Sequence, residues 1–222
     1  MQQTITIAPS DPKSPMKKQV SLFQAQRNFP FFTLLFGLLA LAVSISPQMT
    51  SWFQFDREAL QHGEIWRTLT GHLTHWSASH LFWDILVFLV LAGTIEWFSR
   101  RRLLGCFATS SLVISLLVFI LLPEMGYYRG LSGIDSGLFI LLLVLLYRRN
   151  ASGENLLHKS PYLLFGLLFI SKSVFELKTA QTLFVPSADL FTPVPMAHLG
   201  GALVGGIIGM LPLRRRHMLL ER

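Results

Sequence analysis

Apolar segments near the length that crosses a lipid bilayer recur along this 222-residue chain. A transmembrane helix needs about 20 mostly apolar residues. Hydrocarbon offers no partners to the backbone, and the alternating pattern of a β-barrel strand is not present, so the segments are expected to be helices. We therefore predict an all-α membrane protein with six transmembrane helices, at about 29–46, 80–98, 103–122, 131–148, 161–176 and 194–213.

Composition supports one membrane domain rather than a soluble one. Charged residues make up only 14% of the chain, against about 25% in soluble domains. Residues 1–28 read as a polar, basic cytoplasmic N-terminal tail, 29–213 as the membrane domain and 214–222 as a basic cytoplasmic C-terminal tail. The lone Cys106 allows no intrachain disulfide and makes a poor metal site, so neither a metal nor a cofactor is expected.

The net charge of +7 is explained by orientation better than by a nucleic-acid partner, because basic residues flank the predicted spans. They gather before the first span, after the second, fourth and sixth, and near the fifth: Lys13, Lys17, Lys18, Arg27, Arg100, Arg101, Arg102, Arg148, Arg149, Lys159, Arg214, Arg215 and Arg216. The alternate loops carry only Arg57, Arg67, Arg129 and Lys178. The positive-inside rule then places both termini in the cytoplasm.

Polar residues gather at one depth on three of these spans, all of which enter from the outer face. They are His75, His80 and Asp84 on or before the second, Ser132, Asp135 and Ser136 on the fourth, and His198 on the sixth. At about 1.5 Å rise per residue, Asp84 lies only about 6 Å below His80. Ionisable groups in hydrocarbon are functional candidates. Ser132 with His198 therefore suggests a serine hydrolase.

Small residues at helical spacing explain how two of these spans could touch. The glycines concerned are Gly133 and Gly137 on the fourth span and Gly201 and Gly205 on the sixth. Membrane helices pack closely where such residues align. His198 shares the stripe of the sixth span, so this contact would carry Ser132 toward it. Ordinary packing explains the glycines alone, but not a serine and a histidine at matched depth.

With these residues the chain resembles the rhomboid intramembrane serine proteases over most of residues 60–210. The matching pieces are Gly130-x-Ser132-Gly133, His198-x-x-Gly201-x-x-x-Gly205, Trp66-Arg67, His75-x-x-x-x-His80-x-x-x-Asp84 and Gly93-Thr94-Ile95-Glu96. The resemblance implies a six-helix rhomboid-like bundle around a short central fourth helix, with a Ser132–His198 dyad rather than a triad.

The same resemblance implies supporting roles for other residues. His80 and the Ser132 backbone N–H would help form the oxyanion hole, with Gly130 and His75 as oxyanion or orienting residues. Glu96 would stabilise the fold near the cytoplasmic side. The implied location is the bacterial cytoplasmic membrane, with the active site toward the periplasm.

Two departures from the rhomboid pattern affect this site. Asp84 stands where rhomboids usually carry asparagine. It is either protonated in its apolar setting or paired with His80, orienting that ring and favouring its charged form, and we prefer the pairing. Ser136 stands where an aromatic residue often stacks on the histidine, so we expect Asp135 or Ser136 to help hold His198.

These departures look like the rhombosortase subfamily, which implies a narrow substrate class. The expected partners are the lipid bilayer and membrane-anchored surface or secreted proteins with a C-terminal tail of Gly-Gly, an apolar helix and basic residues. Glycine weakens a helix by about 1 kcal/mol relative to alanine, so a Gly-Gly pair is a natural place to unwind. Nothing in the sequence demands a partner subunit, so a monomer is expected.

Two other readings stay open at this point. A non-catalytic rhomboid-like module could bind transmembrane helices without cutting them. A metalloenzyme or ion transporter could use the histidines and Asp84, although no HExxH motif exists and histidines five residues apart do not share a helical face well. We expect Lys172 to snorkel outward and His72 to be solvated or structural.

Overall fold

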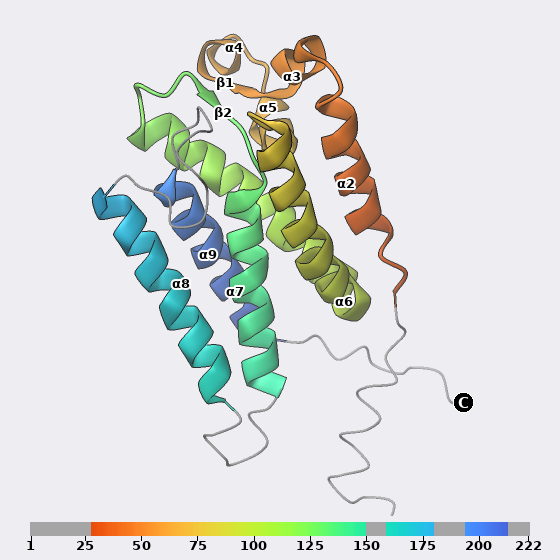
Figure 1. Cartoon of the computed structure of the whole chain (residues 1–222), viewed down its shortest axis with the longest axis vertical. Helices are drawn as coiled ribbons and strands as arrows, with labels where there is room; N and C mark the ends of the chain where they lie inside the picture. The colour runs from red at the N-terminus through yellow and green to blue at the C-terminus, as the bar shows by residue number, and fades with distance from the viewer. Residues whose placement is uncertain (1–27, 150–158, 180–193, 213–222) are drawn as a thin grey trace, which may run out of the picture.

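The computed structural model describes residues 28–149, 159–179 and 194–212, and 80% of these are helical. The predicted C-terminal tail and all but the last residue of the predicted N-terminal tail lie outside the described residues. Long helices form the body of the molecule (Figure 1): α2 (Phe31–Val43), α6 (Ala78–Leu121), α7 (Ser132–Arg149), α8 (Ser160–Thr179) and α9 (Pro195–Met210).

Short elements gather at the end of the bundle where α6, α7 and α9 begin (Figure 1). The helical turns there are α3 (Pro47–Phe53), α4 (Arg57–Gln61), α5 (Arg67–Thr70) and η1 (Gly71–Leu73). Strand β1 (Phe55–Asp56) pairs antiparallel with β2 (Tyr127–Tyr128). Buried Arg67 holds this region by donating to the carbonyls of Ser51 and Gln54. We call these short elements the loop cap.

Among the described helices, α6 and α8 are long and apolar enough to cross a membrane, and α2 and α9 are shorter apolar helices. The sequence predicts separate helices at 80–98 and 103–122, and both lie within α6, which non-helical dihedrals interrupt at Ser99 (φ −158°, ψ 91°). The rings of Phe88 and Phe107 lie 6.1 Å apart, although a straight helix would separate them by about 28 Å. Ser99 therefore divides α6 into two arms that fold back on each other.

Two charged side chains, the buried Glu96 and the partly buried Arg57, hold helix ends. At the end of the bundle away from the loop cap, the Glu96 carboxylate accepts from the backbone N–H groups of Phe32 and Thr33 at the start of α2. Arg57 donates to carbonyls at the end of α6, among them Val118 and Leu122. The first N–H groups and last C=O groups of a helix have no partner within the helix, so these contacts satisfy groups that are otherwise unpaired.

Helix α7 lies centrally, between α6, α8 and α9 (Figure 1). Its apolar side chains Ile134, Leu138 and Leu141 are fully buried. It meets α9 backbone to backbone: a Cβ atom on Gly137 would lie 2.8 Å from the Gly201 oxygen. Such contact is closer than any side chain allows. It fixes the two helices in one register.

Candidate active site

Ser132 and His198 meet at the loop-cap end of the bundle. Ser132 is the first residue of α7, and His198 lies in the first turn of α9, which begins at Pro195. The Ser132 Oγ and His198 Nε2 atoms are 3.2 Å apart, within hydrogen-bond distance. Both side chains are partly exposed. Because the glycine stripe brings α7 and α9 together just below, the two polar groups face each other.

The Asp84 carboxylate lies beside Ser132, on the first arm of α6. Its Oδ2 atom accepts from the backbone N–H groups of Leu131 and Ser132, at 2.9 and 3.1 Å. The Nε2 atoms of His75 and His80 lie 3.3 and 3.2 Å from the same oxygen. Four nitrogen atoms thus converge on one oxygen at the positive end of α7, a place that favours an anion. We call this group of four nitrogen atoms the anion nest.

The expected oxyanion-hole donor is therefore engaged in this structure. The Ser132 N–H, which the sequence reading assigns to a reaction oxyanion, donates to Asp84. Asp84 contacts His80 as the preferred reading expects. It also contacts His75 and the start of α7, which sequence reasoning did not foresee.

Gly130 gives the anion nest its shape. Its φ of +124° lies in a region that residues with a Cβ rarely adopt. A Cβ atom there would lie 2.9 Å from His80 Cε1 and 3.3 Å from Asp84 Oδ2. Glycine is therefore needed both for the turn into α7 and for the space that His80 occupies.

His75 belongs to the segment between the loop cap and α6. Its ring packs edge-on against the ring of His80, with centroids 5.0 Å apart. Arg129 donates to the His75 carbonyl and to the Gln54 side chain, which ties this segment to the strand before α7. Burial lowers the pKa of His75, and the neighbouring Asp84 partly offsets that effect. His75 is thus held through its ring by His80 and Asp84 and through its backbone carbonyl by Arg129.

The second ring nitrogen of His198 faces α8. The Glu176 Oε2 atom lies 3.7 Å from His198 Nδ1, and the Glu176 side chain is only 2% exposed. Lys172, one turn earlier, donates to both carboxylate oxygens at 2.7 and 2.8 Å. Sequence reasoning missed Glu176, and its expectation that Lys172 extends outward differs from this contact. The i, i+4 spacing of opposite charges within an apolar span was the available signal.

Asp135 and Ser136 do not fill the role expected of them. The Ser136 hydroxyl donates to the Ser132 carbonyl within α7. Asp135 is buried, and its Oδ1 atom has no hydrogen-bond partner among the described residues. Within the described part of the chain, the polar partners of His198 are Ser132 and Glu176.

His72 is fully buried in η1, so it is structural rather than solvated. Its Nε2 atom lies 3.0 Å from the Ser111 carbonyl oxygen of α6. Burial lowers the pKa of His72 to about 4. Over residues 28–149, 159–179 and 194–212, no group of three or more His, Cys, Asp or Glu side chains is arranged to hold a metal ion.

The fold and the site define an α-helical membrane protein in which a serine hydroxyl and an imidazole face each other near one end of the bundle. Residues 62–215 match the family model described as the Rhomboid domain. The chain belongs to the rhomboid family, whose members are generally intramembrane serine proteases. No curated protein matches the chain.

Proposed function

We propose that this protein is an intramembrane serine endopeptidase in which Ser132 is the nucleophile and His198 the general base. The observation that carries the proposal is the 3.2 Å separation of Ser132 Oγ and His198 Nε2. A serine hydroxyl is a weak nucleophile until a base takes its proton. Histidine is suited to that task near neutral pH.

The reaction follows from this pair. Ser132 Oγ attacks the scissile carbonyl carbon while its proton passes to His198 Nε2. When the tetrahedral intermediate collapses, the C–N bond breaks and His198 gives the proton to the leaving amine. A water molecule then hydrolyses the acyl-enzyme by the same steps, with His198 again as base, and Ser132 is restored. No cofactor takes part.

The anion nest is proposed to serve the oxyanion. His80 Nε2 and the Ser132 N–H would stabilise the negative oxygen of the intermediate, with His75 supporting His80. In the resting protein the Asp84 oxygen accepts from the Ser132 N–H and faces His80 Nε2 at 3.2 Å, so it must release both groups as the substrate carbonyl arrives. Its pairing with His80 and His75 holds both rings toward this position.

The proposed topology has six transmembrane passes, made by α2, the two arms of α6, α7, α8 and α9. Arg100, Arg101 and Arg102 lie at the turn between the arms, at the end away from the site. At the site end, Arg57 and Arg67 bind backbone carbonyls. By the positive-inside rule both termini are cytoplasmic and the site faces the periplasm of a bacterial inner membrane.

The proposed substrates are membrane-anchored surface or secreted proteins with a rhombosortase-type tail of Gly-Gly, an apolar helix and basic residues. A serine protease needs an extended backbone, and the helical form of an anchor hides its peptide bonds. Two glycines weaken a helix by about 2 kcal/mol relative to alanines. A Gly-Gly pair at the depth of Ser132 would therefore unwind most easily where the nucleophile lies. We propose that the enzyme acts as a monomer.

Co-expression with a reporter that carries such a tail tests the proposal. Wild-type protein should release a product whose C-terminus lies at or beside the Gly-Gly pair, as mapped by mass spectrometry, and Ser132→Ala should not. A reporter with Ala-Ala in place of Gly-Gly is the matched control and should be cut more slowly. A fluorophosphonate probe should label the wild-type protein and leave Ser132→Ala unlabelled.

A non-catalytic rhomboid-like module that binds transmembrane helices is the competing interpretation. It predicts no fluorophosphonate labelling that depends on Ser132. It also predicts that the reporter copurifies uncut with wild-type protein and with Ser132→Ala alike. Either result would replace the protease assignment.

A further inference from the structure

We propose that Glu176 is a positioning residue that orients His198, so that the dyad works as a Ser132–His198–Glu176 triad. This inference rests on the proposed protease function and deepens it. The rhomboid resemblance implies only a dyad, and the observations that lead beyond it are the contacts of α8.

The two nitrogens of the His198 ring face different partners. Nε2 lies 3.2 Å from Ser132 Oγ and Nδ1 lies 3.7 Å from Glu176 Oε2. A proton on Nδ1 that points at a carboxylate leaves the lone pair on Nε2, where the serine proton must go. The same carboxylate stabilises the imidazolium that forms during attack. Glu176 thus occupies the third position of a catalytic triad.

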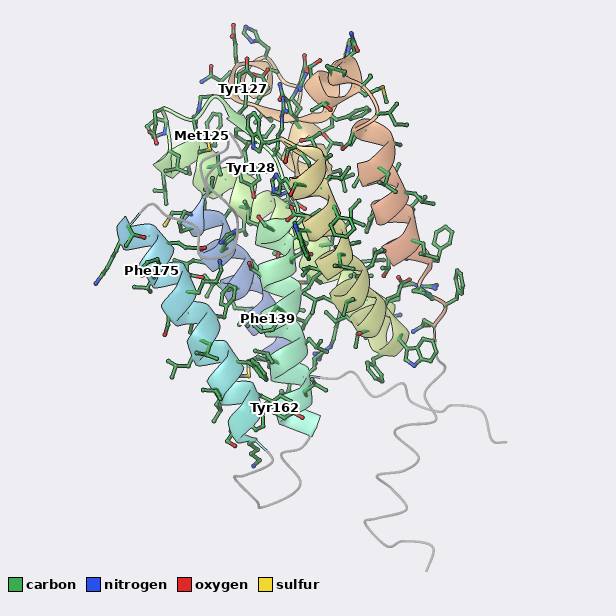
Figure 2. All side chains as sticks on the ribbon, viewed as in Figure 1. Met125, Tyr127, Tyr128, Phe139, Tyr162 and Phe175 are labelled. Atoms are coloured by element: carbon green, nitrogen blue, oxygen red, sulfur yellow. The ribbon has the colours of Figure 1, made fainter. Side chains whose placement is uncertain are left out.

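The distance from Nδ1 to Glu176 is longer than a hydrogen bond, by about 0.5 Å relative to a 3.2 Å limit. Catalytic hydrogen bonds are often long without substrate and tighten in the complex. Glu176 and His198 lie on different helices, so a small approach of α8 toward α9 closes the gap. Figure 2 shows the neighbouring Phe175 at the loop-cap end of α8 and Tyr162 at the opposite end. The 3.7 Å approach of Glu176 to His198 places this carboxylate at the depth of the dyad.

Burial of the Glu176 carboxylate requires an explanation. An acid in an apolar span is expensive and needs partners. Lys172 supplies one, because its ammonium group donates to both oxygens. The Lys172 side chain is 26% exposed whereas that of Glu176 is 2% exposed, so the carboxylate points inward. If Lys172 and Glu176 paired only to neutralise their charges within α8, the Glu176 carboxylate would not need to face His198.

The polar neighbour on α7 makes another contact, so the role of orienting His198 falls to a residue of α8. Ser136, one turn below Ser132, donates to the Ser132 carbonyl. The aromatic rings of Phe139 on α7 and Phe169 on α8 lie 5.8 Å apart, and Figure 2 shows Phe139 farther down α7. This contact places α8 against α7 below the site, and Glu176 then reaches His198 from α8.

The test compares two variants in full-length protein. Lys172→Met keeps the carboxylate and removes its cation, whereas Lys172→Met with Glu176→Gln removes both charges and leaves no lysine without a partner. We expect kcat on the Gly-Gly reporter to fall at least about 10-fold in the double variant with KM unchanged, since loss of the acid in known triads lowers kcat by larger factors. Lys172→Met should lose clearly less kcat than the double variant, because its carboxylate has lost the ammonium partner but still faces His198.

A second readout does not depend on turnover. In ¹⁵N-histidine spectra, with the His198 signals identified by their loss in His198→Gln, the proton should lie on Nδ1 in wild type and in Lys172→Met. The double variant should shift toward a mixture of tautomers. A structural ion pair would instead leave the tautomer unchanged in the double variant, change kcat equally in both variants, or leave kcat unchanged in both.

The outcomes separate this inference from the function on which it rests. If wild-type protein cuts the reporter and neither kcat nor the His198 tautomer depends on Glu176, the triad is wrong and the protease assignment stands. If wild-type protein neither cuts nor labels but the tautomer follows Glu176, the protease assignment is wrong and only the orienting contact remains.

Discussion

A single methyl group between α7 and α9 should separate Ser132 from His198, the proposed catalytic pair. In Gly201→Ala, the new Cβ atom would lie 2.9 Å from the Gly133 carbonyl carbon and closer still to its oxygen. Carbon atoms in contact prefer about 3.5 Å. The helices must therefore move apart by at least about 0.6 Å. Ser132 Oγ and His198 Nε2 start 3.2 Å apart, so this shift takes them out of hydrogen-bond range.

The expected loss follows from that displacement. A misplacement of about 1 Å in a catalytic constellation can lower the rate about 100-fold, and we expect a fall of about 10- to 100-fold in the rate of fluorophosphonate labelling. Overpacking would destabilise the fold by about 1–3 kcal/mol. The higher helix propensity of alanine offsets up to about 1 kcal/mol of this. The protein should therefore still fold.

Gly206→Ala is the matched control on the same helix. Its Cβ atom would lie 3.8 Å from Ile140 Cγ2, an ordinary contact. It gains the same helix propensity without pressing on α7, so its labelling rate should match wild type and its thermal midpoint in detergent should equal or exceed that of wild type. Labelling of Gly201→Ala at the wild-type rate would refute the claim that glycine contact sets the geometry of the dyad. Equal losses in both variants would refute it as well.

Four further perturbations probe the surroundings of the dyad. Asp84→Asn should lower kcat about 10-fold, because the amide oxygen can accept from the backbone N–H groups at the start of α7 but carries no charge to hold the two histidines. Full activity of this variant would exclude a special role for the carboxylate. Gly130→Ala, with strain of about 1–3 kcal/mol, should slow labelling at least about 10-fold, and an unchanged rate would contradict the packing against His80. Burial lowers the pKa of His72 in the folded protein to about 4, so between pH 6.5 and 4 protonation favours the unfolded state. About 3 kcal/mol of the stability present at neutral pH is therefore lost as pH falls through this range. Thermal midpoints in detergent should depend less on pH in His72→Gln than in wild type, and an unchanged slope would contradict this. Glu96→Gln should cost about 2–3 kcal/mol through weaker capping of α2 and lower the thermal midpoint, while labelling at low temperature should persist because Glu96 lies at the far end of the bundle.

Much of the helical arrangement could be predicted from the lengths of the apolar segments. The runs at 80–98 and 103–122 correspond to the two arms of α6, and the runs near 131–148, 161–176 and 194–213 fall on α7, α8 and α9. The join between the arms was predicted as a short loop but is a break at Ser99 alone. Apolar pattern reports which residues lie in hydrocarbon. It does not report where the backbone leaves helical dihedrals.

Part of the candidate site could likewise be predicted from the sequence, and part of it could not. Because helical rise is fixed, the starting residue of each span sets the depth of its polar groups, so the sequence could predict that Ser132 and His198 lie at one level. The rotation of α8 that turns Glu176 toward His198 depends on packing against α7 and α9. Asp84 accepts hydrogen bonds from the Leu131 and Ser132 N–H groups. These bonds likewise depend on where the first arm of α6 meets α7.

The sequence by itself determined that this chain is a helical membrane protein, which polar groups share a depth, and where two helices can touch through glycine. Those properties follow from local rules: span length, helical rise and side-chain size. Only the tertiary structure decided which donors converge on Asp84 and which acid faces His198. Those choices depend on how the helices rotate and lean against one another, and no single segment of the sequence encodes that arrangement.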